Sequence, residues 1–102
     1  MSDRRYELEI ADNAQRDIIE IRLFSVEVWG EHQADDYLAR LSAGIESLQA
    51  NPLLGKSRGD MRPGIRQLVV GEHRMLYRIS GDVVWILRVV HSRKDLSRIR
   101  PS

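Results

Sequence analysis

The chain has 102 residues, of which 42% are hydrophobic and 30% are charged, and its formal net charge is +1. This length suits one domain around a single hydrophobic core, so we expect residues 1–102 to form one unit without an internal boundary. The chain contains no cysteine, which excludes disulfides and thiolate metal sites and is typical of proteins in a reducing cytoplasm. Its first residues lack an apolar signal core, and its longest uncharged apolar run, residues 83–87, is too short to span a bilayer. We therefore expect a cytoplasmic protein without membrane contact.

The small net charge conceals a strong segregation of charge along the chain. Residues 1–55 carry five arginines against eleven acidic residues, a net charge of −6. Residues 56–102 carry eleven basic residues against four acidic ones, a net charge of +7. This asymmetry fits contact with nucleic acid, an acidic protein partner, or complementarity between helices and sheet within the fold. Charge alone does not select among these three interpretations.

Apolar periodicity in the first half predicts one strand followed by two helices. Residues 6–10 alternate apolar and charged side chains, as in a strand with one solvent-exposed face. From Asp12, which we place at the N-cap, apolar residues recur at steps of three and four as far as Gly30, which is placed to end the helix. A second helical stripe covers residues 34–48 and ends before the Asn-Pro pair at 51–52, because a residue before proline is disfavoured in the α region. The short turn at Gly30 should make the two helices an antiparallel hairpin.

The second half predicts a loop and then three strands. Residues 51–64 concentrate glycine, proline and basic residues, which is typical of a connecting loop. Between residues 65 and 95, turn signals at Gly71 and Gly81 divide a stretch rich in Val, Ile and aromatic residues into three strand-sized runs, the pattern of consecutive β-hairpins. We therefore expect an α+β two-layer fold of order β-α-α-β-β-β, in which the N-terminal strand and the antiparallel helix hairpin pack on an antiparallel sheet.

Two combinations that resemble catalytic motifs are better explained as ordinary structure. Residues 55–57, Gly-Lys-Ser, match the end of a phosphate-binding P-loop, but position 50 is alanine in place of the required glycine, and Pro63 prevents the helix that should follow. No serine lies in a nucleophile-elbow motif, and the serine, histidine and carboxylate of a triad occur by chance in most short sequences.

The other titratable residues give no metal site and no acid–base pair. The histidines lie on different predicted elements without the i, i+4 spacing of a helical metal pair; they are His32, His73 and His91. We expect no metal and no other cofactor. The helix carboxylates fall opposite the apolar stripes and are expected to form a solvated face; they are Asp17, Glu20, Glu27, Asp35, Asp36 and Glu46.

The two tryptophans have different expected environments. Trp85 shares strand parity with Val83, Leu87 and Val89, which predicts a core position beneath the helices. Trp29 lies beside the hairpin turn and is available to a partner.

Over nearly its whole length the chain resembles the ParE/RelE superfamily of bacterial toxins from type II toxin–antitoxin modules. The resemblance rests on the element order and on short motifs at matching spacing. These are Ala14-x-x-Asp17-Ile18-x-x-Ile21, Gly30-x-x-x-Ala34-x-x-Tyr37, Leu48-x-x-Asn51-Pro52-x-x-Gly55, Arg66, Tyr77-Arg78-Ile79 and Val89-Val90-His91-Ser92-Arg93-Lys94-Asp95. The Asn-Pro-x-x-Gly loop and the His-Ser-Arg-Lys-Asp ending are similar to the ParE-like branch.

The ParE-like resemblance implies a toxin that inhibits DNA gyrase through a binding surface and has no enzymatic chemistry of its own. It also implies a cognate ParD-like antitoxin whose C-terminal segment folds onto the toxin. The antitoxin's N-terminal part would bind operator DNA, so the toxin would meet the operator only indirectly. Basic residues on the sheet and at the exit of its last strand are the candidates for contact with the target. They are Arg66, Arg74, His91, Arg93 and Lys94.

The RelE-like branch implies a different activity, ribosome-dependent cleavage of messenger RNA. Arg74 and Arg93 fall where that branch keeps two arginines, and His91 could supply a group that titrates near neutrality. The position of the branch's tyrosine falls near Ile99, which cannot transfer a proton, so the ParE-like interpretation is preferred. A third interpretation is a degenerate toxin that is retained only to bind an antitoxin.

Overall fold

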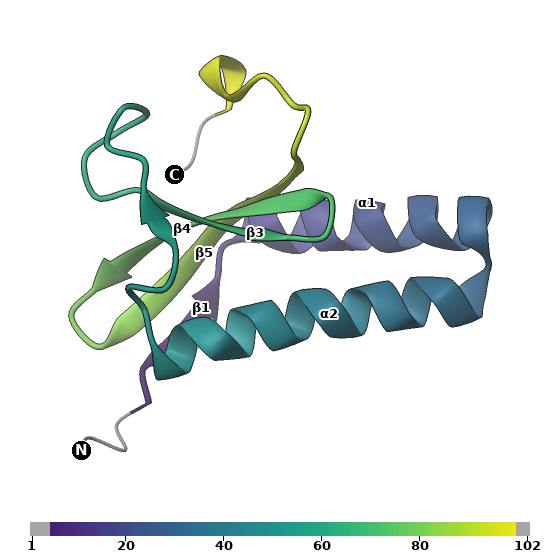
Figure 1. Cartoon of the computed structure of the whole chain (residues 1–102), viewed down its shortest axis with the longest axis horizontal. Coiled ribbons are helices and arrows are strands. Elements are labelled where there is room, and N and C mark those ends of the chain that lie inside the picture. The colour runs from purple at the N-terminus through teal and green to yellow at the C-terminus, as the bar shows by residue number, and fades with distance from the viewer. Residues whose placement is uncertain (1–4, 100–102) are drawn as a thin grey trace.

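The computed structural model describes residues 5–99 and shows a helix hairpin packed on one side of a five-stranded sheet (Figure 1). The elements in chain order are β1 (Glu7–Ile10), α1 (Asp12–Trp29), α2 (Glu31–Ala50), β2 (Lys56–Ser57), β3 (Arg66–Val70), β4 (His73–Ser80), β5 (Val83–His91) and a 3-10 helix (Leu96–Arg98). The predicted α+β two-layer fold is confirmed. Within residues 5–99, no helix is long and apolar enough to cross a membrane.

The sheet has the strand order β1-β5-β4-β3-β2. β3, β4 and β5 form the predicted antiparallel meander, whereas β1 joins β5 in parallel, with Glu7 beside Val83 and Ile10 beside Ile86. The sheet is therefore mixed, and the expectation of an antiparallel sheet holds for the meander but not for β1. Parallel neighbours need a long crossover connection, and the helices with β2–β4 supply it. Lys56 and Ser57, which were predicted to lie in a loop, pair with β3 as a two-residue edge strand.

The turns and helix ends lie close to their predicted positions. Gly71 and Gly81 have φ angles of 56° and 57°, in the left-handed region that favours glycine, and each begins a hairpin turn. The N-cap of α1 is Ala11, not Asp12, which is the first helical residue. The difference arises because Ala11 still takes part in strand pairing, where its N–H donates to the carbonyl oxygen of Ile86 at 2.9 Å.

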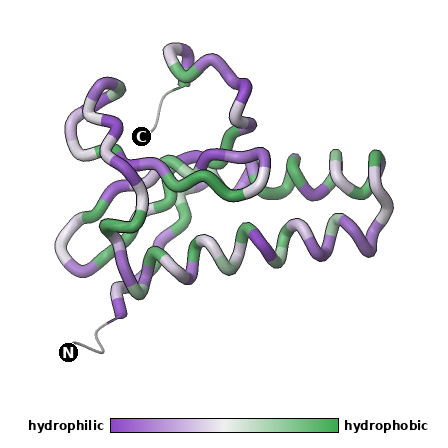
Figure 2. Tube along the Cα trace, viewed as in Figure 1, coloured by the Kyte–Doolittle hydropathy of each residue, from purple (hydrophilic) through white to green (hydrophobic). Residues whose placement is uncertain are grey.

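The apolar stripes of both helices pack on the facing side of the sheet and form the main core (Figure 2). Its buried members are Ala14, Ile21, Tyr37, Leu41, Ile45, Leu48, Met75, Tyr77, Val84, Ile86 and Val89. A smaller cluster of Leu76, Val90 and Ile99 covers the opposite face of the sheet. The meander is therefore buried on parts of both faces, which fits its apolar composition.

Trp85 lies outside the helix-facing core, so its predicted position was wrong. β5 contains a bulge in which Leu87 is an extra residue relative to β4. Ile86 before the bulge and Val89 after it both face the helices, although an uninterrupted strand would place them on opposite faces. Trp85 points to the other side, where the guanidinium carbon of Arg78 lies 5.7 Å from its ring centroid. If alternation is assumed to continue across a bulge, the residues at one end of the strand are assigned to the wrong face of the sheet.

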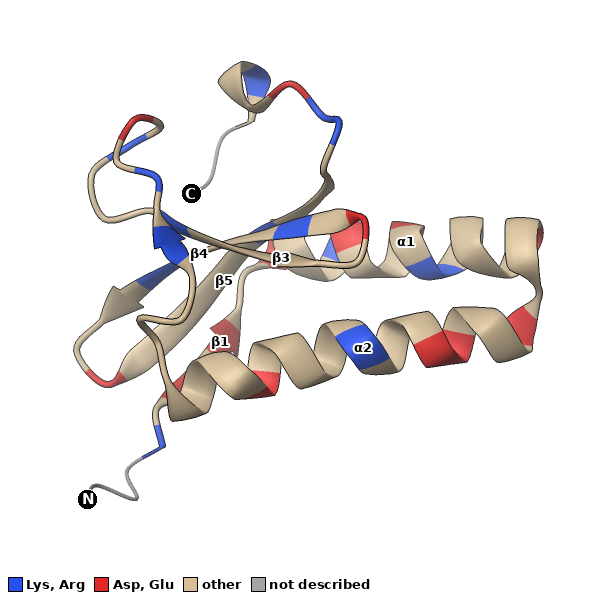
Figure 3. Ribbon diagram, viewed as in Figure 1, with Lys and Arg blue, Asp and Glu red and all other residues tan. Residues whose placement is uncertain are grey.

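Charge is divided between the two layers (Figure 3). Acidic residues predominate on the helices and β1, whereas most Lys and Arg side chains lie on the meander, on the loop after β2 and on the segment after β5. Asp17 of α1 and Arg88 of β5 form an ion pair across this division. Part of the charge asymmetry therefore reflects complementarity between helices and sheet.

Candidate functional site

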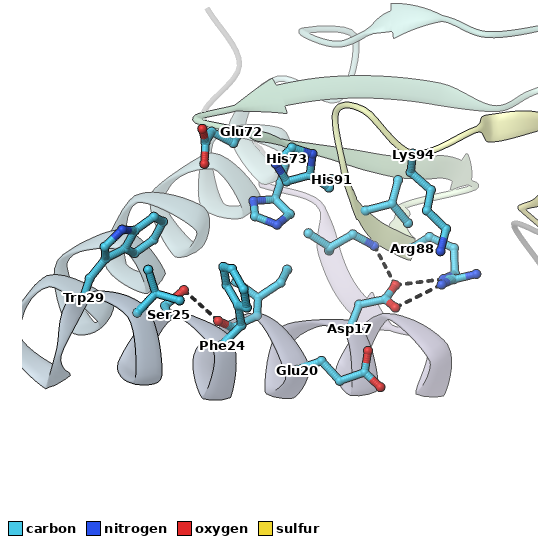
Figure 4. Close-up of a pocket in the computed structure, with 14 residues that line it drawn as sticks. Asp17, Glu20, Phe24, Ser25, Trp29, Glu72, His73, Arg88, His91 and Lys94 are labelled. Carbon is cyan, nitrogen blue, oxygen red and sulfur yellow. Dashed lines mark hydrogen bonds and ion pairs between the residues drawn. The ribbon is translucent and has the colours of Figure 1, made fainter.

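A groove lies between α1 and the edge of the sheet where β4 begins and β5 ends (Figure 4). We call it the α1–β5 groove, and its volume is about 490 Å³. Apolar side chains from α1 and β5 make most of its wall; they are Ile21, Phe24, Val28, Trp29, Val89 and Val90. Charged and polar groups surround this wall; they are Asp17, Glu20, Glu72, His73, Arg88, His91 and Lys94. The groove is therefore an apolar surface with a polar rim.

The groove exists because the helix hairpin extends past the end of the sheet (Figure 1). Phe24 and Val28 fall on the apolar stripe that the sequence assigns to the core, but no strand reaches them, and they are 60% and 54% exposed. Ser25 at the base of the groove is fully buried, and its hydroxyl donates to the carbonyl oxygen of Ile21 at 2.6 Å. A contiguous exposed apolar surface of this kind is typical of a site that binds a partner.

Asp17 and Arg88 form an ion pair at one end of the groove. The carboxylate of Asp17 accepts hydrogen bonds from Arg88 Nε at 2.8 Å, from Arg88 Nη2 at 3.0 Å and from the Val89 N–H at 2.9 Å. These hydrogen bonds raise the pKa of Arg88 above its ordinary value. The side chain of Asp17 is only 11% exposed, so its predicted place on a solvated face was wrong. β1 ends opposite Ile86, and beyond that point Asp17 provides the acceptor for the edge of β5.

Tyr37, His73 and His91 form a second polar group next to the groove. The hydroxyl of Tyr37 accepts a hydrogen bond from the Glu72 N–H at 3.0 Å and lies 2.5 Å from His73 Nδ1. Burial, together with the nearby charge of His91, lowers the pKa of His73. Burial also raises the pKa of Tyr37, so its hydroxyl stays protonated at neutral pH and can donate to the neutral imidazole.

Five aromatic rings form a continuous row from α1 to the end of β5. Successive ring centroids are separated by 6.4 Å from Phe24 to Trp29, 6.0 Å from Trp29 to Tyr37, 5.5 Å from Tyr37 to His73 and 5.4 Å from His73 to His91. These separations lie in the favourable range for aromatic pairs. The row links both helices to the sheet and holds the exposed rings of Phe24 and Trp29 in place for a ligand.

The predicted target-contact residues at the exit of β5 lie together at the surface. His91 and Lys94 line the α1–β5 groove, and both are exposed. Arg93 is also exposed, and its backbone N–H donates to His91 Nδ1 at 3.1 Å. This turn therefore presents two permanent cations beside the groove.

The other two predicted residues make hydrogen bonds within the protein itself, although Arg74 lies across the sheet from Val90, the neighbour of His91. Arg66 donates through Nη2 to the carbonyl oxygens of Leu53 at 3.2 Å and Gly55 at 2.5 Å. Arg74 donates to the side-chain oxygen of Gln67 at 3.2 Å. The structure thus brings together three of the five predicted residues.

Sequence reasoning missed the groove and the aromatic row. A signal was present in α1, where Phe24 and Val28, which line the groove, and Ile19 and Leu23, which do not, give more apolar residues than one buried face needs; all four are more than half exposed. The contact of Tyr37 with His73 joins positions 36 residues apart, and no local pattern marks such a pair.

Comparison with known proteins identifies the family. The sequence pattern of the ParE toxin of the type II toxin–antitoxin system parDE matches residues 8–96. The chain belongs to the ParE toxin family. Toxin ParE1 of Mycobacterium tuberculosis (strain ATCC 25618 / H37Rv) is 38% identical over 86 residues, which cover 83% of this chain and 88% of that protein. Toxin ParE1 of Caulobacter vibrioides is 35% identical over 82 residues, which cover 80% of this chain and 84% of that protein.

Two solved structures share the fold of this ParE family member. A chain of the chromosomal ParDE toxin–antitoxin system from P. aeruginosa has a TM-score of 0.75 at 22% identity and covers 85% of this chain and 96% of its own length. A chain of the toxin–antitoxin complex RelBE2 from Mycobacterium tuberculosis has a TM-score of 0.63 at 25% identity, with coverages of 88% and 94%. The fold therefore occurs in both ParDE and RelBE systems and does not by itself separate the two activities.

Proposed function

We propose that this ParE family member inhibits DNA gyrase by binding to it, without enzymatic chemistry of its own, and is neutralised by a cognate ParD-like antitoxin in the cytoplasm. The observation that carries the proposal is the match to the ParE toxin family across residues 8–96, together with relatives named Toxin ParE1. The family match identifies a toxin of a toxin–antitoxin system. Gyrase as the target and a ParD-like protein as the antitoxin are what we propose.

The environment of His73 supports binding in place of catalysis. Its Nδ1 atom is engaged by the Tyr37 hydroxyl within the fold. A histidine that acts in proton transfer needs a nitrogen within reach of the substrate and a pKa near neutrality, and burial moves the pKa of His73 away from that range. RelE-like cleavage of messenger RNA remains the alternative, because the RelBE2 chain shares the fold.

The antitoxin is proposed to bind in the α1–β5 groove. An amphipathic segment can place its apolar side chains on Phe24 and Trp29 and its acidic side chains near Lys94. The antitoxin's C-terminal segment should be net acidic, because residues 56–102 of the toxin carry a net charge of +7. In a binding assay Phe24→Ala should weaken the antitoxin about tenfold or more. Leu23→Ala is the matched control, because Leu23 is similarly exposed on the same helix but does not line the groove.

Target contact is proposed for the exposed residues at the exit of β5, His91, Arg93 and Lys94. Arg66 and Arg74 make internal hydrogen bonds, so we propose that they support this function by holding the loop and the sheet. The double variant His91→Ala/Arg93→Ala should lose toxicity while it keeps its fold, since exposed substitutions usually change stability by less than about 0.5 kcal/mol. Full toxicity with a normal thermal midpoint would place the target site elsewhere.

Expression in bacteria tests the proposed function directly. Production of the chain alone should arrest growth and induce the DNA-damage response, and co-production of the antitoxin should restore growth. Arrest with rapid cleavage of messenger RNA and without a DNA-damage response would favour the RelE-like alternative. Tight antitoxin binding without arrest would indicate a degenerate toxin.

A further inference from the structure

The loop that follows α2 holds two leucine side chains in solvent. Leu53 is 67% exposed and Leu54 is 50% exposed. They lie at the opposite end of α2 from the hairpin turn (Figure 1), about 30 Å away for a helix of this length. No residue of this loop lines the α1–β5 groove. The two leucines therefore form an apolar surface separate from the groove.

A buried tyrosine anchors the backbone on both sides of the two leucines. The hydroxyl of Tyr77, which is completely buried, donates to the carbonyl oxygen of Pro52 at 2.7 Å and accepts from the Gly55 N–H at 2.9 Å. At position 55 only glycine fits, because a Cβ atom would lie 2.5 Å from the Tyr77 hydroxyl. The loop is thus tied to the core at positions 52 and 55.

Further hydrogen bonds fix the two residues between these anchors. Asn51 accepts from the Leu53 N–H through its side-chain oxygen at 3.3 Å and from the Leu54 N–H through its carbonyl oxygen at 3.1 Å. The guanidinium of Arg66 binds the carbonyl oxygens of Leu53 and Gly55. Hydrogen bonds from the side chains of Asn51, Arg66 and Tyr77 therefore fix the backbone around Leu53 and Leu54.

These contacts explain the Asn-Pro-x-x-Gly motif and leave the two middle positions undetermined by the fold. The anchors use Asn51, Pro52 and Gly55, whereas neither leucine side chain belongs to a core cluster. Apolar side chains that the fold does not require, on a backbone that is already ordered, suit an interface because little conformational entropy remains to be lost on binding.

We propose that Leu53 and Leu54 form a second contact with the toxin's protein target, by inserting into an apolar pocket. This inference rests on the proposed function, and it adds a surface to the cluster at the exit of β5. Charge indicates the kind of pocket: residues 51–64 carry three basic residues against Asp60, which pairs with Arg58, so Lys56 and Arg62 leave a net charge of +2 and an acidic rim would be complementary. Arg66 is then a positioning residue, because it orients the loop through its backbone.

The test compares two double variants of the full chain with purified DNA gyrase holoenzyme as the probe. Leu53→Ser/Leu54→Ser should raise the concentration for half-inhibition of supercoiling about tenfold or more, whereas Leu53→Met/Leu54→Met should stay close to wild type. Ile19→Ser/Leu23→Ser is the matched control, since it removes similarly exposed apolar side chains from α1 outside the groove. Antitoxin affinity, thermal midpoint and elution volume on size exclusion are measured on every variant.

Each result supports or overturns the proposal. Loss of inhibition in the serine pair alone, with antitoxin affinity, midpoint and elution volume unchanged, supports it. Retained inhibition, equal loss in the α1 control, selective loss of antitoxin affinity, or a changed elution volume of the serine pair overturns it. If the wild-type chain does not inhibit gyrase, the proposed function fails. The loop is then tested by growth arrest, which the serine pair should abolish and the α1 control should retain; arrest by the serine pair overturns the loop proposal.

Discussion

Substitution of Asp17 by asparagine tests whether the ion pair with Arg88 stabilises the contact between α1 and the sheet. Asparagine keeps the shape and one acceptor for the Val89 N–H but removes the negative charge that binds the guanidinium. The 3.0 Å hydrogen bond from Nη2 is lost, and the 2.8 Å bond from Nε, which uses the same oxygen as the Val89 N–H, loses its charge assistance; these two charge-assisted contacts are worth about 1.5 kcal/mol or more each. The Arg88 side chain is 21% exposed, so water replaces them only in part. The expected loss is about 3 kcal/mol in the free energy of unfolding.

Urea denaturation followed by circular dichroism measures this loss, which corresponds to a fall of about 14 °C in the thermal midpoint. Asp36→Asn is the matched control, because the Asp36 carboxylate is 72% exposed and its change should stay within about 0.5 kcal/mol. A double-mutant cycle with Arg88→Gln should give a coupling energy of about 2 kcal/mol. A loss below about 1 kcal/mol in Asp17→Asn, or a coupling near zero, would refute the reasoning.

Three further predictions concern the loop anchor and the histidine beside the groove. Gly55→Ala should lower the free energy of unfolding by about 2 kcal/mol in the urea assay, because its Cβ would lie 2.5 Å from the Gln67 carbonyl oxygen. Gly59→Ala is the control and should be close to neutral, because the atom nearest to its Cβ would be 3.8 Å away. Tyr77→Phe should cost about 2 kcal/mol in thermal unfolding, since the Gly55 N–H and the Pro52 carbonyl lose their partner; an unchanged midpoint would contradict the anchor. Burial lowers the pKa of His73, so the unfolded chain takes up a proton at a higher pH than the folded chain. The stability contributed by neutral His73 is therefore lost as pH falls through the ordinary histidine pKa of about 6.5. The pH dependence of unfolding should therefore be shallower in His73→Gln than in wild type, and equal slopes would exclude His73 as its source.

The layers and element order were predictable because they depend on local patterns. The apolar stripes define α1 and α2, and the glycines at 71 and 81 mark the hairpin turns. The parallel pairing of β1 with β5 joins residues more than 70 positions apart, and the bulge at Leu87 has no mark of its own in the sequence. Trp85 was therefore assigned to the wrong face.

The candidate site was predictable only where residues are neighbours in sequence. His91 ends β5, Arg93 and Lys94 follow it, and the three lie together, as expected for a strand exit. Asp17 was assigned to the solvated face because it is acidic and lies on a helix. It pairs with Arg88 instead, since folding brings Arg88 and the Val89 N–H at the sheet edge next to it. Phe24 fits the core stripe of α1 and is exposed because the sheet ends before reaching it. These differences come from where the sheet ends, which no local pattern specifies.

Inhibition of purified gyrase is the measurement that tests the central claim most directly. The wild-type chain is titrated into a supercoiling reaction with and without its antitoxin, and in parallel into a ribosome-dependent assay of messenger RNA cleavage. The account predicts loss of supercoiling that the antitoxin reverses, with the messenger RNA intact. Cleavage of messenger RNA on ribosomes with unchanged supercoiling would contradict it.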